Sequence, residues 1–209
     1  DISNHIIKKL DKQVSLPSKV RFNDGKTDGY GRFWCGTMSE SNPSKPDGAL
    51  YMINNKLEIH EIVKGIHISN SITSSLDNRF LFYADTYKKL IFKADLNNKK
   101  PHLDKSRVII DNKNLKGFPD GSTIDKDGCL WNAEWNGGQV VQYDEVGKII
   151  NTMKTPMKKP TCVAFGGLNM NKLFITSAQD NNNDQDDISG KTICIDTKVK
   201  GLYSNRFYI

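Results

Sequence analysis

Arg21-Phe-Asn-Asp-Gly-Lys26 and Gly31-Arg-Phe-Trp-Cys-Gly-Thr-Met38 form a two-part pattern that returns three more times along the chain. In each of the first three copies a polar residue precedes a short strand-like run by a nearly constant interval. These pairs are Asn23 with Gly31, Asn70 with Asn78 and Asp120 with Asp127, at separations of eight, eight and seven residues. If the repeats close into a ring, the polar side chains are expected to meet near its axis.

The strand-like runs indicate one kind of structural repeat. They begin at Gly31, Asn78, Asp127 and Asn171, so that successive starts lie 47, 49 and 44 residues apart. Each run opens with a turn residue and continues with β-branched or aromatic residues, which favour strands. Second strands are expected in Lys89–Asp95, Gln139–Asp144 and Thr192–Asp196. No window keeps a helical stripe, and a period in the mid-forties is typical of a four-stranded propeller blade. The sequence therefore predicts an all-β β-propeller.

We expect one β-propeller domain over residues 1–209, made of about four blades plus a leading strand. The last copy runs close to the carboxyl terminus, so any further blades are expected before Asp1, and we interpret the domain as N-terminally incomplete. The polar start, Asp1–Lys19, resembles the end of an earlier repeat. It lacks the basic segment, apolar stretch and cleavage site of a secretory signal.

Composition excludes several classes of function. No apolar run is long enough to span a bilayer, so we expect no membrane insertion. The net charge is +6, but the lysines come in scattered pairs without interleaved aromatic residues. This pattern favours a solvated surface over a nucleic-acid groove. The pairs are Lys8-Lys9, Lys88-Lys89, Lys99-Lys100 and Lys158-Lys159.

The four cysteines argue against a zinc site or disulfide framework. Cys35, Cys129, Cys162 and Cys194 have neither CxxC spacing nor a nearby His partner. Each falls inside a predicted strand, so we expect reduced, half-buried core thiols. Reduced thiols predict a cytoplasmic location.

Equivalent positions of successive inner strands converge on the channel of a propeller. The equivalent tripeptides here are Arg21-Phe-Asn23, Ile68-Ser-Asn70, Phe118-Pro-Asp120 and Lys159-Pro-Thr161. Asp120 is the only carboxylate at these positions, and we expect it to be the only carboxylate of this chain in the channel. Carboxylate and amide oxygens are ligands for Ca²⁺, Mg²⁺ or Mn²⁺ and are tolerated by Zn²⁺. The alternative is that Asn70 and Asp120 only cap turns at the strand ends, as Asn and Asp often do.

Several short motifs, in the same order and spacing, resemble the regucalcin (senescence marker protein) and gluconolactonase family. The match runs from about Arg21 to the carboxyl terminus. The motifs are Arg21-Phe-Asn-Asp-Gly-Lys26 with Gly36-Thr-Met38, Ile68-Ser-Asn70 with Tyr83-Ala-Asp-Thr86, Pro119-Asp-Gly121 with Asn136-Gly-Gly138, and Phe165-Gly-Gly167.

The resemblance implies a six-bladed propeller that holds one divalent metal ion and hydrolyses a sugar lactone. In the family the metal is held by a Glu, an Asn and an Asp, and the last two match Asn70 and Asp120. The Arg and Asn that contact substrate match Arg21 and Asn23, while the acidic residue after Gly-Thr-Met is matched loosely by Glu40. The metal-binding Glu belongs to a part of the family expected before Asp1.

One departure from the family concerns Ser71, which stands where the family usually has Gly. Serine at a turn that requires a positive φ is strained, because Gly alone adopts that conformation without penalty. We therefore expect Asn70 to be presented in a strained turn.

These residues predict a mechanism with two competing interpretations. One divalent ion (Ca²⁺, Zn²⁺, Mn²⁺ or Mg²⁺) is expected to activate water and the lactone carbonyl. Asp120 would act as a metal ligand and general base, while Arg21 and Asn23 orient a small-molecule sugar lactone. The alternatives are a calcium-binding regulatory protein without turnover and an inactive truncated propeller. We expect a monomer.

Three other features are assigned structural roles. Trp34 and Trp131 are expected in the core between blades. His67 is expected to point to the opposite strand face from Asn70. The acidic run Asp180–Asp187 fails the EF-hand pattern, so we expect a surface loop there.

Overall fold

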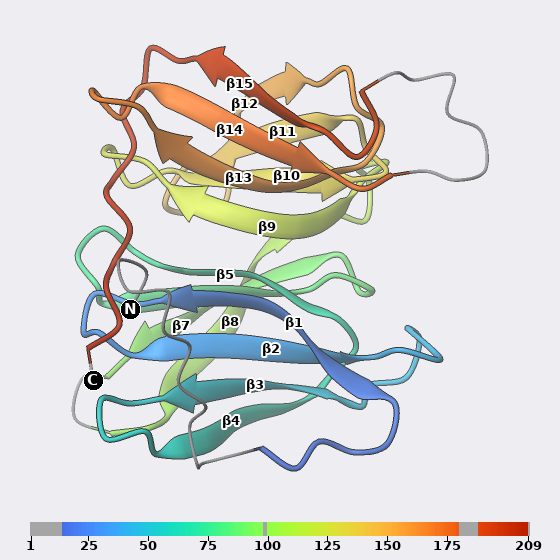
Figure 1. Cartoon of the computed structure of the whole chain (residues 1–209), viewed down its shortest axis with the longest axis vertical. Helices are drawn as coiled ribbons and strands as arrows, with labels where there is room; N and C mark the ends of the chain where they lie inside the picture. The colour runs from blue at the N-terminus through green and yellow to red at the C-terminus, as the bar shows by residue number, and fades with distance from the viewer. Residues whose placement is uncertain (1–13, 98–99, 180–187, 209) are drawn as a thin grey trace, which may run out of the picture.

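The computed structural model describes residues 14–97, 100–179 and 188–208. Within these residues the chain forms fifteen β-strands in four antiparallel sheets, and the remainder is turns and extended segments (Figure 1). No helix among them has the length and apolar character that a membrane span requires. The all-β prediction is confirmed.

Each sheet is one blade, numbered here in chain order. Blade 1 contains β1 (Val20–Thr27), β2 (Phe33–Ser39), β3 (Gly48–Ile53) and β4 (Ile59–Ile66). Blade 2 contains β5 (Ser69–Ser74), β6 (Phe80–Asp85), β7 (Leu90–Leu96) and β8 (Leu103–Asp111). Blade 3 contains β9 (Phe118–Ile124), β10 (Leu130–Trp135), β11 (Gln139–Tyr143) and β12 (Ile149–Lys154). Blade 4 contains β13 (Pro160–Gly166), β14 (Lys172–Ser177) and β15 (Thr192–Asp196).

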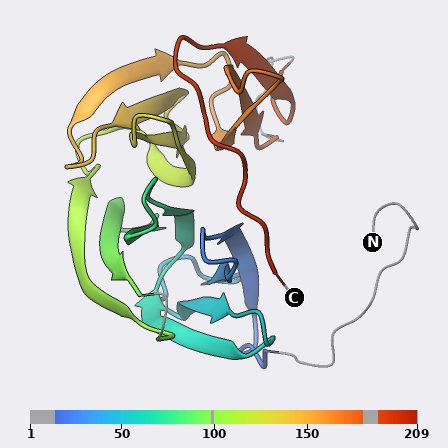
Figure 2. The same ribbon diagram turned by 90° about the vertical axis from the view of Figure 1, so that its left-hand side faces the viewer.

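The blades follow one another around an arc, with the first strand of each on the inside. Contacts join β1 to β5, β5 to β9, and β9 to β13, so these four inner strands line a common channel. Figure 2 shows that the arc is open between blade 4 and blade 1. We call the end of the channel at which the inner strands begin the mouth. The propeller arrangement inferred from the repeat is confirmed.

The period of two along each strand explains how a blade packs on both of its neighbours. Leu81 and Tyr83 of β6 join a core with Trp34 of blade 1. Phe82 and Ala84 alternate with these two residues along β6, so they face the other way and join the core shared with blade 3.

A third hydrophobic core lies between blades 3 and 4. Its buried members are Trp131, Ala133, Val140, Met157, Val163, Leu173 and Ile175. The prediction that Trp34 and Trp131 pack in the core is confirmed, since their side chains are buried at 1% and 4% exposure.

Four hairpin turns share one hydrogen-bonding pattern, in which a side-chain oxygen of Asn or Asp accepts from the backbone N–H groups two and four residues later. The acceptors are Asp28, Asn54, Asp125 and Asp144. Such side-chain bonds fix a tight turn because they replace the backbone partners that the turn lacks. The recurring Asn/Asp/Gly turns of the sequence thus mark where strands reverse.

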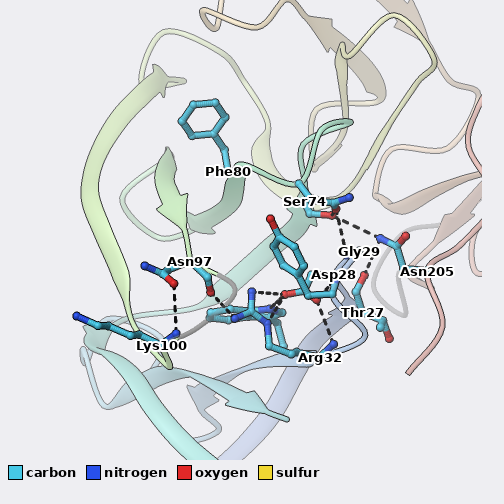
Figure 3. A network of polar contacts seen from close by, with 12 residues as sticks. Thr27, Asp28, Gly29, Arg32, Ser74, Phe80, Asn97, Lys100 and Asn205 are labelled. Carbon is cyan, nitrogen blue, oxygen red and sulfur yellow. Dashed lines mark hydrogen bonds and ion pairs between the residues drawn. The ribbon is translucent and has the colours of Figure 1, made fainter. Parts of the chain in front are cut away.

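Two of these turns also anchor a core tryptophan. Asp28 Oδ2 accepts from Trp34 Nε1 at 2.8 Å and pairs with the Arg32 guanidinium, as part of the network in Figure 3. Asp125 Oδ2 accepts from Trp131 Nε1 at 2.7 Å and from Gln142 Nε2 at 2.9 Å. The bonds from Trp34, Trp131 and Gln142 satisfy donor groups that would otherwise be buried without hydrogen-bond partners.

The carboxyl-terminal segment crosses the open side of the arc from blade 4 to blade 1 (Figures 1 and 2). Gly201 forms a bridge with Asp125, and Asn205 Nδ2 donates to Thr27 O at 3.2 Å. Figure 3 shows Asn205 beside Thr27. Further along, Phe207 packs edge-on against Phe33 with ring centroids 6.4 Å apart. The segment therefore ties the two ends of the arc together.

The expectation of four half-buried thiols within strands is wrong. The cysteines are free, but only Cys35 is buried and Cys129 is half-buried, whereas Cys162 and Cys194 are exposed. Cys129 lies just before β10 rather than within a strand. The alternating exposure of β13, β14 and β15 shows the cause for the other two, because one face of blade 4 is not covered by a described blade. The acidic run Asp180–Asp187 lies outside the described residues.

Candidate functional site

Three of the sequence-predicted residues meet at the channel mouth. Asn23 of β1 donates through Nδ2 to Asn70 Oδ1 of β5, at 2.8 Å, and to Ser69 O at 3.1 Å. Arg21 NH1 donates to Asn23 Oδ1 at 3.0 Å. The guanidinium is exposed and the Asn70 side chain is buried. The cluster thus extends from solvent into the channel wall.

A second set of bonds links Asn70 to blade 3. Asn70 Nδ2 donates to Thr86 Oγ1 at 2.9 Å, and the Thr86 hydroxyl donates to Pro119 O at 2.7 Å. The Asn70 amide nitrogen therefore faces Thr86, and its Oδ1 faces Asn23. These contacts fix the orientation of the carboxamide oxygen.

Ser71 has the strained backbone that the sequence predicts. Its φ is 56°, in the left-handed region, within a bulge of β5 between Asn70 and Thr73. The Ser71 hydroxyl donates to Asp120 O at 2.5 Å and accepts from Asn132 Nδ2 at 2.9 Å. These bonds couple the strained turn directly to the strand that carries Asp120.

Asp120 lies half-buried on β9 and has an unusual acidity. Burial, together with the nearby carboxylates of Asp24 and Glu134, raises its pKa to about 8 against the opposing effect of the Gly121 N–H. Two effects therefore act together, because both desolvation and like charge disfavour the ionised form. In the absence of a cation, this carboxyl is mostly protonated at neutral pH.

Asp24 is a second carboxylate beside the channel, so the expectation that Asp120 is the only one is wrong. Its Oδ2 accepts from Ile72 N of β5 at 3.1 Å, and its Oδ1 accepts from Gly25 N at 2.8 Å. Burial raises the pKa of Asp24 as well. The sequence signal was the acidic residue next to Asn23. Strict alternation hides it, because a bulge in β1 between Phe22 and Gly25 lets both neighbours face β5.

Below this cluster the channel widens into a cavity of about 430 Å³, bounded on one side by the carboxyl-terminal segment. Lys26 and Cys162 line it together with Asp24. Lys26 Nζ donates to Ser122 O at 2.8 Å, and burial lowers the pKa of this amine. Cys162 is exposed by surface area, but it lines the cavity, where desolvation by the surrounding atoms raises the pKa of its thiol and disfavours the thiolate.

Glu134 is a fully buried acid that the sequence did not single out. Its Oε1 accepts from Asn112 Nδ2 at 2.7 Å, while its Oε2 has no hydrogen-bond partner among the described residues. Burial raises its pKa to about 7, and the Lys89 charge and the Tyr143 hydroxyl oppose that shift. The side chain lies against Gly117, where a Cβ would approach its Cβ to 2.6 Å. Glu134 is thus enclosed behind the rim of the mouth.

The remaining predicted positions lie at the edge of this arrangement. Glu40 follows β2, is exposed, and donates its backbone N–H to Lys19 O at 2.8 Å. No hydrogen bond within the described part of the chain joins its side chain to Asn23, Asn70 or Asp120. The Thr161 hydroxyl bonds to Thr176 of β14. His67 Nδ1 pairs with Asp85 Oδ2 at 2.8 Å and its ring stacks on Tyr87, so it belongs to a separate cluster.

The donor set fits part of a divalent metal site. Asn70 Oδ1 and the Asp120 carboxylate are hard oxygen donors of the kind that Ca²⁺ and Mg²⁺ prefer. Burial is the main cause of the raised pKa values of Asp24 and Asp120, and a cation beside them would lower both pKa values. Over residues 14–97, 100–179 and 188–208, however, no three His, Cys, Asp or Glu side chains group as ligands.

Comparison with known proteins shows the family to which the chain is similar. Residues 2–179 match the sequence profile described as SMP-30/gluconolactonase/LRE-like region. An uncharacterized protein of Sulfolobus acidocaldarius is 40% identical over 164 residues, which cover 78% of this chain and 59% of that protein. Regucalcin of Danio rerio is 36% identical over 168 residues, which cover 79% of this chain and 57% of its own length.

A solved structure shows the same arrangement of strands. The crystal structure of a calcium-binding protein, regucalcin, from Agrobacterium tumefaciens superposes with a TM-score of 0.86 at 31% identity. The superposition covers 91% of this chain and 66% of that one. The chain spans somewhat more than half the length of the curated relatives that it matches.

Proposed function

Because the chain belongs to the SMP-30/gluconolactonase/LRE-like family, we propose that it hydrolyses a sugar lactone at the channel mouth with the help of one divalent metal ion. The observation that carries this proposal is that hydrogen bonds join Arg21, Asn23 and Asn70 at the channel mouth, beside the strand of Asp120. The backbone oxygen of Asp120 accepts from the hydroxyl of Ser71, which follows Asn70. Asn70 and Asp120 would hold the ion. When bound, the ion would supply Lewis acidity to the lactone carbonyl and to water.

Residues of the chain would supply the general base and the groups that bind the substrate. Asp120 accepts the proton of the attacking water, which requires its ionised form. In the metal-free chain its pKa is raised to about 8, and a cation bound beside it would lower that pKa and favour the ionised form that accepts the proton. Arg21 and Asn23 donate to the hydroxyl and carbonyl oxygens of the sugar, and these donors stabilise negative charge on the former carbonyl oxygen.

The test is replacement of Asp120 with Ala. We expect metal-dependent lactone hydrolysis, followed as acid release at constant pH, to fall to the spontaneous rate. Asp127→Ala is the matched control, because it removes an exposed carboxylate from a turn of the same blade. Full activity in Asp120→Ala, with the far-ultraviolet circular dichroism of both variants unchanged, would disprove the assignment.

A second candidate is calcium binding without turnover. It is favoured by the purely oxygen character of the donor pair and by the similar Agrobacterium tumefaciens protein, which is described as calcium-binding. Calorimetric titration with Ca²⁺, Mn²⁺ and Zn²⁺ separates the candidates when it is paired with the lactone assay. Binding of Ca²⁺ without hydrolysis of any lactone would favour the second. Absence of binding at millimolar metal would exclude both and leave the inactive propeller.

A further inference from the structure

The rim of the mouth on blade 3 carries an aromatic pair enclosed by two lysines. Phe118 of β9 and Trp135 of β10 pack edge to face with ring centroids 6.0 Å apart. Lys89 Nζ, from the loop after β6, lies 4.4 Å from the centre of the Phe118 ring. Lys159 Nζ, from the loop before β13, lies 5.4 Å from the centre of the Trp135 ring. We call these four residues the basic rim.

The basic rim adjoins the proposed reaction centre. Phe118 and Asp120 are two residues apart on β9, so their Cα atoms are about 7 Å apart. All four rim side chains are half-buried, which leaves part of each surface open to a ligand. The rim is built within blades 2, 3 and 4, which are consecutive and packed on one another.

The electrostatic environment of the rim favours an anion. Lys89 Nζ donates to Leu115 O at 2.7 Å but forms no ion pair with a described carboxylate. Lys88, Lys116 and Lys158 lie exposed on the loops of the same end. Among the described residues, the acidic groups at this end include Asp111, which pairs with Lys113 at 3.0 Å, and Asp85, which lies 3.8 Å from Lys88 and pairs with His67. Asp120 and the buried Glu134 are the acids of blade 3 nearest the rim.

Glu134 weakens this positive field less than an ordinary carboxylate would. Its raised pKa of about 7 leaves it ionised for only part of the time at neutral pH. Aromatic rings offer a large apolar contact surface to a ligand, and lysine ammonium groups donate charge-assisted hydrogen bonds to carboxylate or phosphate oxygens.

We propose that the basic rim binds a negatively charged substituent, a phosphate or a carboxylate, on the sugar that enters the mouth. This inference rests on the proposed lactone hydrolysis for the identity of the sugar, and it makes the substrate an anionic rather than a neutral lactone. Phe118 and Trp135 contact the carbon skeleton, Lys89 and Lys159 bind the anionic group, and the lactone carbonyl faces Asp120. The rim is a specificity element and takes no part in bond breaking.

The test uses polyols, which have no lactone bond and therefore report binding independently of turnover. The 209-residue chain is titrated with glucitol, glucitol 6-phosphate, gluconate and inorganic phosphate by calorimetry. We expect at least one of the two anionic polyols to bind about tenfold more tightly than glucitol, the scale of two partly exposed ion pairs. Comparison of the two shows whether phosphate or carboxylate is preferred.

Two double variants identify the residues responsible. Lys89→Gln with Lys159→Gln should abolish the preference for the anionic polyol. Lys88→Gln with Lys158→Gln changes the net charge equally on neighbouring residues of the same loops and should preserve it. An equal loss in both double variants would overturn the proposal, because the effect would then be one of net charge.

Other outcomes separate this inference from the proposed function. Equal affinity for glucitol and both anionic polyols would disprove anion binding by the basic rim, even if a neutral lactone is hydrolysed. Inorganic phosphate that binds as tightly as glucitol 6-phosphate would overturn the assignment to a sugar. Selective binding of an anionic polyol by a chain that hydrolyses no lactone would support the rim and reject the hydrolytic function.

Discussion

Asp120 is a carboxylic acid in surroundings that favour its neutral form. Its pKa is raised to about 8 in the folded chain, against a usual value near 4 in the unfolded chain. A raised folded-state pKa means that the folded chain binds a proton that the unfolded chain releases. The stabilisation is therefore complete below about pH 4 and is lost progressively as the pH rises to about 8.

Replacement of Asp120 with Asn should remove this pH dependence in metal-free protein. The variant should be more stable than the unmodified chain by about 2 kcal/mol at pH 8.5, with almost no difference at pH 4, as measured by urea unfolding with chelator present. Added Ca²⁺ should stabilise the unmodified chain at pH 8.5 and leave Asp120→Asn unchanged. Asp127→Asn, at an exposed turn, serves as control. A difference that is the same at both pH values would contradict the raised pKa.

Individual residues also show how far sequence reasoning reaches. The common positions of Asn23, Asn70 and Asp120 could be inferred because strand repeats preserve register. Asp24 could not, since the bulge that turns it toward β5 is a local break in alternation that composition does not reveal. Glu134 was missed for another reason: its burial depends on close approach of the glycine backbone at Gly117 and Gly137.

The hairpin turns link sequence to architecture at the scale of elements. An Asn or Asp that accepts N–H groups two and four residues later marks strand reversal in blades 1 and 3. Blade 2 differs, because Ser75 occupies the equivalent turn and accepts from Phe80 N at 3.0 Å. The strands could therefore be located from the sequence, while the anchoring of Trp34 and Trp131 by these turns required the structure.

Asp125→Asn should destabilise the chain because it places an amide donor where the acceptor for Trp131 Nε1 and Gln142 Nε2 stands. We expect a loss of about 2–4 kcal/mol in the free energy of unfolding, the cost of disrupted buried bonds. Asp144→Asn is the matched control. Its turn uses only one oxygen, which Asn retains, so the loss should stay below about 1 kcal/mol. Equal losses in both variants, measured by denaturant titration, would refute this account.

The tertiary structure places one lysine of each of two lysine pairs beside an aromatic side chain. Lys88-Lys89 and Lys158-Lys159 have no aromatic residues interleaved with the lysines in sequence, a pattern that predicted a solvated surface. The fold brings Phe118 and Trp135 between Lys89 and Lys159 from other strands. Only the antiparallel pairing of β9 with β10 makes this association, so no local pattern could predict it.

At the scale of the whole molecule, the carboxyl-terminal segment holds an open arc together. Asn205 and Phe207 attach it to blade 1 through Thr27 and Phe33. Asn205→Ala combined with Phe207→Ala should lower the free energy of unfolding by about 2–3 kcal/mol, as one lost hydrogen bond and one half-buried ring. Tyr203→Ala is the control, since that ring is 79% exposed. A loss as large in Tyr203→Ala would mean that the contacts with blade 1 do not matter.

The same segment has a consequence for folding rates. Each blade is made of hairpins whose strands are neighbours in sequence, whereas Asn205 and Thr27 are separated by 178 residues. Closing so long a loop costs more chain entropy than forming a hairpin, so this contact should form after the folding transition state. Contacts absent from the transition state govern how fast a protein unfolds. The carboxyl-terminal segment therefore acts as a kinetic latch, whose removal should accelerate unfolding while refolding proceeds at an almost unchanged rate.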